Sequence, residues 1–305
     1  MQVSVTISGF TRLFDNDIAK VIDAAKVIDD SGVHQLVLAD HVVMGDRTDR
    51  YPFGTFPYPS AEPWPEPLTL LAAIAAVTHQ VRLGTGILIA PLRAPALLAK
   101  TVATLDQISN GRVDLGVGTG WQREEYAACD VPWASRWQRL DDTMRACAAL
   151  WTIPGPVQFA SETVSFDAVW CNPMPVQQVA DSGIPIWYGV AASGEHIDRM
   201  AELGAGWLPI HTTTAEELRE GIRALRAAVA ARGRDPKAFH VRAGGKPVMG
   251  DDGLVDIGAT QAENAWLAAA GVDSVSIGTG RHVGDAASLR TFLSAAVEAF
   301  AGLSS

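Results

Sequence analysis

Residues 81–117 decide the fold, because they contain a strand, a helix and a second strand in succession. They include VRLGTGILI at 81–89, PALLAKTVATLDQIS at 95–109 and VDLGV at 113–117. The outer runs are short and apolar, which is typical of strands buried on both faces, and the middle run has apolar residues at helical spacing. This order predicts two parallel strands joined by a helical crossover.

The same alternation continues in both directions along the chain. The other expected strands are 3–7, 35–39, 184–189, 206–210, 239–242 and 272–277. The other expected helices are 15–31, 67–78, 135–151, 193–203, 214–232, 257–270 and 286–301. Eight such units in 305 residues favour a closed (β/α)₈ barrel over an open doubly wound sheet. We therefore predict an α/β fold, a TIM barrel in which residues 1–305 form a single domain.

Two irregular segments interrupt the alternation. Residues 42–67 follow the second strand and are rich in proline and aromatic side chains, namely Tyr51, Phe53, Phe56, Tyr58 and Trp64. Loops after barrel strands lie at the C-terminal face, where active sites form, so this insertion predicts a lid or substrate wall, with a plain surface excursion as the alternative. Within residues 153–183, the runs 157–160 and 163–166 predict a small hairpin before the fifth strand.

Composition excludes several classes of protein. With 48% hydrophobic residues the chain is not disordered, and 24 basic against 34 acidic residues give a net charge of −10, which argues against nucleic acid as a partner. The chain has no basic leader before an apolar run and no membrane-length apolar stretch. Cys129, Cys147 and Cys171 form no paired motif, so we expect free thiols, no metal site and a cytoplasmic location. A small-molecule substrate is the expected partner, and a homodimer remains open.

Asp40 and His41 close the second strand, at the barrel end where catalytic groups gather. A histidine can donate or accept a proton near neutral pH, and an adjacent carboxylate can set its charge. Taken alone, the two residues are equally consistent with a pair that merely forms hydrogen bonds at a strand end.

Glycines interrupt two strands in the runs LGTGILIAP at 83–91 and GRVDLGVGTGW at 111–121. Glycine weakens a strand unless a bulge or a close ligand requires it, so we expect backbone to approach a flat group there, with tight turns as the alternative. The run GVAASG at 189–194 enters a helix and predicts an anion pocket, with simple capping by Ser193 as the alternative. No nucleophile elbow and no paired-histidine metal motif occurs.

Together these stretches resemble the luciferase-like monooxygenase superfamily of flavin- and deazaflavin-dependent oxidoreductases. The resemblance is carried by residues 91–100, 105–112 and 115–121 with Glu125, and by parts of 166–187. Asp40-His41 and the run WPEP at 64–67 are most similar to the branch that uses coenzyme F420.

The resemblance implies that the cofactor ring lies across the C-terminal face of the barrel. Asp40 would hydrogen-bond the ring, and His41 would be the catalytic acid or base beside the reactive carbon. Gly86 and Ile87 match a bulge with a non-proline cis peptide that backs one face of the ring. The remaining expected cofactor-binding residues are Thr85 beside that bulge, Gly118, Thr119 and Glu124 near the ring and ribityl chain, and Gly189, Val190, Ala191 and Ser193 at the phosphate pocket.

Several arginines could meet the anionic tail of the cofactor or a polar substrate: Arg47, Arg50, Arg93 and Arg123. Asn110, Trp121 and Glu124 depart from relatives that oxidise sugar phosphates, so we do not expect a sugar-phosphate substrate.

Three functions follow from the resemblance. The first is an F420-dependent oxidoreductase that moves hydride between the deazaflavin and an organic substrate, with His41 handling the proton. The second is an FMN-dependent monooxygenase that uses reduced flavin and oxygen. The third is a protein that binds F420 without catalysis.

Overall fold

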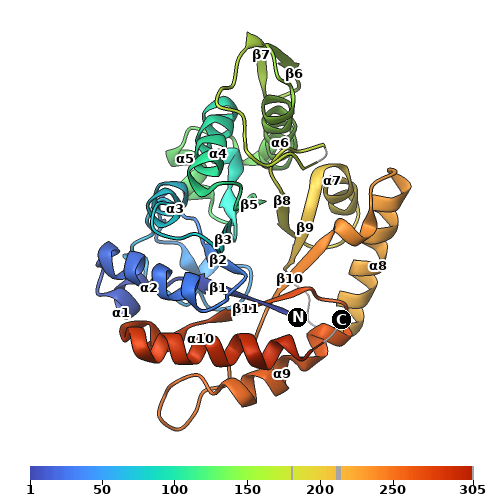
Figure 1. The fold of residues 1–305 in the computed structure, drawn as a ribbon. Helices are drawn as coiled ribbons and strands as arrows, with labels where there is room; N and C mark the ends of the chain where they lie inside the picture. The colour runs from blue at the N-terminus through green and yellow to red at the C-terminus, as the bar shows by residue number, and fades with distance from the viewer. Residues whose placement is uncertain (180, 211–213, 304–305) are drawn as a thin grey trace.

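Eight parallel strands close into a ring in the computed structural model, which describes residues 1–179, 181–210 and 214–303. In order around the ring they are β1 (Gln2–Ile7), β2 (Gln35–Leu38), β3 (Arg82–Thr85), β5 (Val113–Gly118), β8 (Ile186–Val190), β9 (Gly204–Pro209), β10 (His240–Gly244) and β11 (Ser274–Gly278). The closing contacts join β11 to β1 and β3 to β5, both in parallel. The predicted (β/α)₈ barrel is therefore confirmed (Figure 1).

Helices follow the strands and cover the outside of the barrel (Figure 1). The main ones are α2 (Ile18–Asp30), α3 (Pro67–Ala75), α4 (Pro95–Ser109), α6 (Arg136–Thr152), α7 (Glu195–Leu203), α8 (Ala215–Ala231), α9 (Ile257–Ala269) and α10 (Ala286–Ala301). The sequence did not predict two short helices, α1 (Phe10–Phe14) and α5 (Arg123–Ala128).

The first predicted helix begins later than expected. Asp15 and Asn16 have positive φ angles of 52° and 62°, so they form a turn rather than a helix. The side chain of Asp17 accepts a hydrogen bond from the backbone N–H of Ala19 at 2.9 Å and caps α2. Residues 10–14 instead form the separate helix α1.

The third barrel strand is divided, although the sequence predicted one strand over 81–89. β3 ends at Thr85, and β4 (Leu88–Ile89) resumes the pairing with β5, where Leu88 lies opposite Val117. The Gly86–Ile87 peptide bond between them is cis, as the family resemblance implied.

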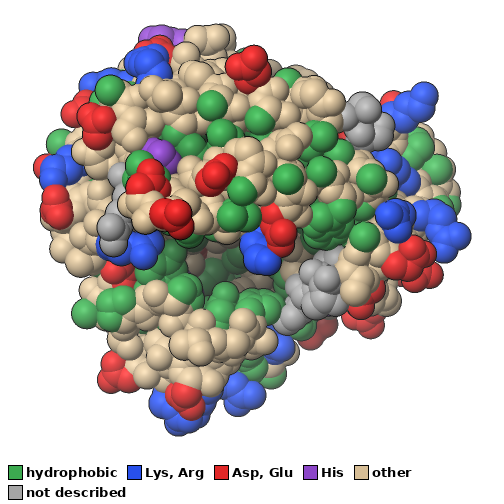
Figure 2. All heavy atoms as spheres, turned by 90° about the horizontal axis from the view of Figure 1, so that it is seen from below, with side chains coloured by type: hydrophobic (Ala, Val, Ile, Leu, Met, Phe, Trp, Pro, Cys, Tyr) green, Lys and Arg blue, Asp and Glu red, His purple; other side chains and the backbone are tan. Residues whose placement is uncertain are grey.

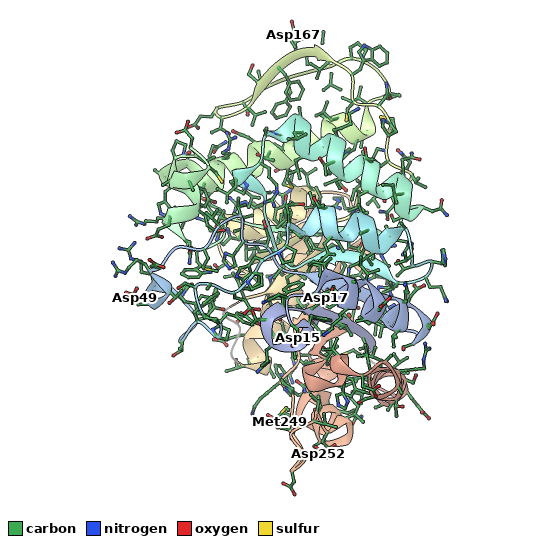
Figure 3. The ribbon with its side chains drawn as sticks, turned by 90° about the vertical axis from the view of Figure 1, so that its left-hand side faces the viewer. Asp15, Asp17, Asp49, Asp167, Met249 and Asp252 are labelled. Atoms are coloured by element: carbon green, nitrogen blue, oxygen red, sulfur yellow. The ribbon has the colours of Figure 1, made fainter. Side chains whose placement is uncertain are left out.

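Two segments project from the barrel: the predicted hairpin and the segment that contains Asp252. The predicted hairpin is present as β6 (Val157–Ala160) and β7 (Ser165–Val169), whose second strand begins later than expected because Ser161 N–H donates to Val164 O and closes a turn. Figure 3 shows Asp167 of β7 at one extreme of the molecule and Asp252 at the other.

The N-terminal end of the barrel is held by buried polar groups. The carboxylate of Asp29, at the end of α2, accepts hydrogen bonds from the backbone N–H groups of His79, Gln80 and Val81 at 2.7–2.8 Å. These bonds fasten the approach to β3 onto α2. None of the helices described here is long and apolar enough to cross a membrane.

Candidate active site

A cavity of about 700 Å³ opens at the C-terminal ends of the strands. Residues of β1, β2, β4, β8, β9, β10 and β11 line it, together with residues 86–87, part of the insertion at residues 42–67, residues 119–121, and Trp133, Arg136 and Trp137. Figure 2 shows a hollow on one face of the molecule, with hydrophobic side chains inside and charged ones around it. The volume is in the range of small-molecule and cofactor sites.

His41 follows β2 and contacts a buried carboxylate. Its Nδ1 lies 3.2 Å from Oε2 of Glu125, and Oε1 of Glu125 accepts the backbone N–H of Val42 at 2.9 Å. His41 is 8% exposed and Glu125 is fully buried. A carboxylate accepts hydrogen bonds, so Nδ1 of His41 carries the proton that points to Glu125. Nε2 of His41 has no hydrogen-bond partner among the described residues, and His41 lines the cavity.

Asp40 also lines the cavity, but its carboxylate is already held by the protein. Its Oδ2 accepts the backbone N–H of Ile89 at 2.8 Å and a bond from Nη1 of Arg93 at 2.7 Å. Arg93 Nη2 reaches Oδ1 at 3.1 Å and Glu66 at 3.0 Å. Asp40 therefore fixes the segment that follows the cis peptide, and Arg93, one of the expected tail-binding arginines, serves this contact.

Ile87 forms a shelf across the cavity mouth. An added Cβ on Gly189 would collide with Cγ2 of Ile87, and one on Gly118 would lie 3.1 Å from Cδ1 of Ile87. An added Cβ on Gly86 would lie 2.6 Å from Cγ1 of Val37. Glycine at these positions lets the bulge enter the barrel, so the residues present fit a flat ring placed against Ile87.

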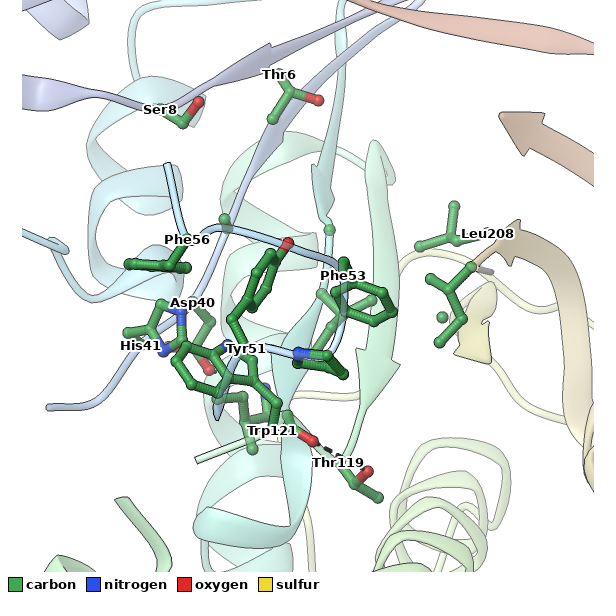
Figure 4. A pocket seen from close by; sticks show the side chains of 18 of the residues that line it. Thr6, Ser8, Asp40, His41, Tyr51, Phe53, Phe56, Thr119, Trp121 and Leu208 are labelled. Atoms are coloured by element: carbon green, nitrogen blue, oxygen red, sulfur yellow. Dashed lines mark hydrogen bonds between the residues drawn. The ribbon is translucent and has the colours of Figure 1, made fainter. Parts of the chain in front are cut away.

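Aromatic side chains surround His41. The ring centroid of Trp64 lies 4.8 Å from that of His41, and those of Phe56 and Trp121 lie 6.0 Å away, all in edge-on geometry. Figure 4 shows His41 and Trp121 on one side of the pocket and Leu208 on the other. The 42–67 insertion thus forms a wall of the cavity, as the sequence predicted.

The predicted cofactor residues divide into two groups. Besides the residues described above, Thr119 lines the cavity. The other predicted residues are not part of the cavity lining: Thr85, Gly118, Glu124, Val190, Ala191 and Ser193. Thr85 donates to the carbonyl of Gly116 at 2.6 Å, so its hydroxyl holds two strands together.

The residue at the N-cap of α7, which follows β8, is not the expected Ser193. Gly194 occupies the N-cap position of α7 with φ 48°, and the side chain of Ser193 makes no capping bond. The alternative expectation of a Ser193 cap is therefore wrong, and Gly194 is used because the backbone there is left-handed.

The expected arginines have mixed surroundings. Arg47 is exposed and pairs with Asp49, while Arg50 lines the cavity and donates to Glu124 at 3.1 Å. Arg136, which was not among the expected arginines, also lines the cavity and stacks on Trp133 at 4.1 Å from its ring centroid.

Glu124 was expected to contact the cofactor, whereas no role was expected for its neighbour Glu125. Glu124 is on the outer side of α5, whereas Glu125 is the buried partner of His41. Glu125 and Tyr126 are the buried residues of this short helix, and the preference of carboxylates for the surface hid the role of Glu125.

Residues 2–254 match the family model described as luciferase-like monooxygenase. An uncharacterised protein of Mycobacterium tuberculosis is 34% identical over 213 residues, which cover 69% of this chain and 70% of the relative. The oxygenase component of a flavin-dependent trigonelline monooxygenase from Acinetobacter baylyi is 31% identical over 58% of this chain and 44% of that protein.

A solved structure with the same fold is an F420-dependent secondary alcohol dehydrogenase in complex with an F420-acetone adduct. It superposes with a TM-score of 0.77 at 15% identity and covers 98% of each chain. At this identity the likeness shows the shared barrel alone.

Proposed function

The chain belongs to the luciferase-like monooxygenase family, and from this premise we propose that it is an F420-dependent oxidoreductase. Its reaction would be hydride transfer to or from an organic substrate, and we propose an alcohol or carbonyl compound because His41, a group able to exchange a proton, lines the cavity. Sequence similarity of Asp40-His41 and residues 64–67 to the F420 branch supports this choice of cofactor.

The buried pair of His41 and Glu125 is the observation that carries the proposal. A bound deazaflavin would supply the hydride chemistry. Interconversion of an alcohol and a carbonyl also moves one proton for each hydride, so the site needs an acid or base at the substrate oxygen. Nε2 of His41 is the group for that proton, because Glu125 fixes the opposite nitrogen.

The other residues orient and shield the reactants. Ile87 would support one face of the ring, and the aromatic wall at Phe56, Trp64 and Trp121 would exclude water from the transfer. Asp40 keeps the shelf in place through its bond to Ile89. Arg50 and Arg136 at the cavity are proposed to meet the anionic tail of the cofactor.

A second candidate is an FMN-dependent monooxygenase, which the 31% identity to the trigonelline monooxygenase component favours. Turnover under two conditions separates the two functions. Reduced F420 is offered with a panel of ketones and aldehydes without oxygen, and reduced FMN is offered with the same panel and oxygen. Carbonyl reduction with F420 supports the proposal, and oxygenated product formed only with FMN supports the second candidate.

A further inference from the structure

Arg242 places a positive charge at the floor of the active-site cavity. It belongs to β10, points into the barrel, lines the cavity and is only 6% exposed. No function assigned above uses this guanidinium.

Its charge is not neutralised by direct contact. Nη1 of Arg242 donates to the side-chain carbonyl of Gln35, whose Nε2 donates to Asp114 at 2.6 Å. Asp114 is itself paired with Arg82 through two bonds of 2.7 and 2.6 Å. Throughout the described ranges, no carboxylate lies within 4.0 Å of Arg242. A buried cation without a direct counterion is costly, which favours an anionic ligand beside it.

The guanidinium lies beside the backbone at Gly84 and Gly86 and 5.7 Å from the ring centroid of Trp187. A Cβ added to Gly86 would be 3.2 Å from Nη2 of Arg242, and one added to Gly84 would be 3.4 Å from Nη1. Nη2 donates to no acceptor found in the described chain. Because Gly86 has no side chain, Nη2 of Arg242 can lie close to the backbone there.

Hydroxyl groups also line the cavity, in contrast to the aromatic wall. Thr6 and Ser276 are lining residues, and their hydroxyl oxygens lie 2.7 Å apart. Burial lowers the pKa of Arg242 to about 10, with the charge of Asp114 opposing the change, so the group is still charged at neutral pH. A ligand with an apolar end and an end that carries anionic oxygen would match this cavity.

We propose that Arg242 receives the pyrimidinedione end of the bound deazaflavin ring and stabilises the negative charge of its reduced form. The inference rests on the proposed function. A hydride brings two electrons and one proton to the ring, so the ring gains one negative charge, which spreads onto its carbonyl oxygens. Arg242 is therefore a positioning residue that sets the reduction potential of the bound cofactor.

Dissociation constants for oxidised and reduced F420, measured by anaerobic calorimetry, test this role. The wild-type protein binds the reduced form more tightly, which makes the potential of bound F420 more positive than that of free F420. Arg242→Met lowers the preference for the reduced form at least tenfold, a shift of about 30 mV for two electrons. Arg242→Lys, which keeps the charge, retains most of the preference.

Arg234→Met is the matched control, because Arg234 is a partly buried arginine that pairs with Asp181 outside the cavity lining. It leaves the preference unchanged. Equal binding of both forms by the wild-type protein would overturn the inference without any variant, as would an Arg242→Met protein that keeps the wild-type preference. Failure to bind either form of F420 would overturn the proposed function as well.

Discussion

Nδ1 of His41 and Oε2 of Glu125 lie 3.2 Å apart at the edge of the cavity, although 84 positions separate the two residues in the chain. The contact joins the end of β2 to α5, a helix that the sequence did not predict. It gives the histidine a fixed orientation and leaves its other nitrogen for chemistry.

Replacement of Glu125 tests this relationship against its neighbour. Glu125→Gln lowers kcat of hydride transfer by about 10²-fold or more, because an amide cannot accept both the Val42 and the His41 protons and the histidine loses its fixed tautomer. Glu124→Gln, in the same helix turn, has a smaller effect. Steady-state kinetics of both variants give the comparison, and a larger loss in Glu124→Gln would contradict the role of Glu125.

Removal of the imidazole tests the proton step. His41→Gln lowers kcat by about 10²–10⁴-fold, the usual contribution of a general acid or base, and changes the dissociation constant of the cofactor little. Single-turnover kinetics and calorimetry measure the two quantities separately. His79→Gln, a change at an exposed histidine outside the cavity lining, is the control with unchanged kcat. A His41→Gln enzyme with the wild-type rate would rule out the assignment.

One added methyl group at Gly189 would fill the space that Ile87 now occupies. Gly189→Ala places a Cβ against Ile87 and costs about 1–3 kcal/mol of stability by overpacking, with weaker cofactor binding because Ile87 must move. Gly278→Ala is the matched change, since an added Cβ there meets nothing within 4 Å. Thermal unfolding and cofactor titration of both variants measure the difference. Wild-type stability and binding in Gly189→Ala would show that the shelf is not constrained.

The hydrogen bonds of Asp29 should make part of the free energy of unfolding depend on pH. Burial alone would raise the pKa of Asp29, but hydrogen bonds from three backbone N–H groups outweigh it and lower the pKa. The stabilisation is complete above the unfolded-state pKa of about 3.9 and is lost as the pH falls through the folded-state value. Asp29→Asn therefore lowers the free energy of unfolding by about 2 kcal/mol at pH 7.

Urea unfolding of Asp29→Asn at several pH values measures this difference, which shrinks below about pH 4. Asp30→Asn is the control, because the one side-chain partner of Asp30 among the described residues is Arg290, in an exposed ion pair. A difference that stays constant down to pH 2 would mean that the charge of Asp29 is not responsible.

The barrel could be predicted because each strand and helix has its own local pattern. Apolar strand runs and amphipathic helices, separated by turns, are visible in any window of the sequence. The cis peptide at residues 86–87 was implied by family resemblance; the glycines there indicated a bulge or a close approach of the backbone, but the apolar pattern placed residues 81–89 in one strand. The start of α2 was misplaced because positive φ angles at Asp15 and Asn16 leave no trace in hydrophobic periodicity.

The site was predicted less completely, because its contacts join distant segments. Asp40 lines the cavity, and its contact with the cofactor stays a prediction; the bonds that its oxygens accept from Arg93 and Ile89 were not predicted. Glu125 and Arg242 are buried charged residues whose partners come from other strands and helices. Such long-range pairing has no sequence signature in a single chain, so burial of a charge had to be observed.

Calorimetric titration of the purified protein with F420 and, separately, with FMN tests the central claim most directly. The account predicts micromolar or tighter binding of F420, with FMN at least tenfold weaker. Tight binding of FMN together with no detectable binding of F420 would contradict it and leave the flavin-dependent monooxygenase as the function of this barrel.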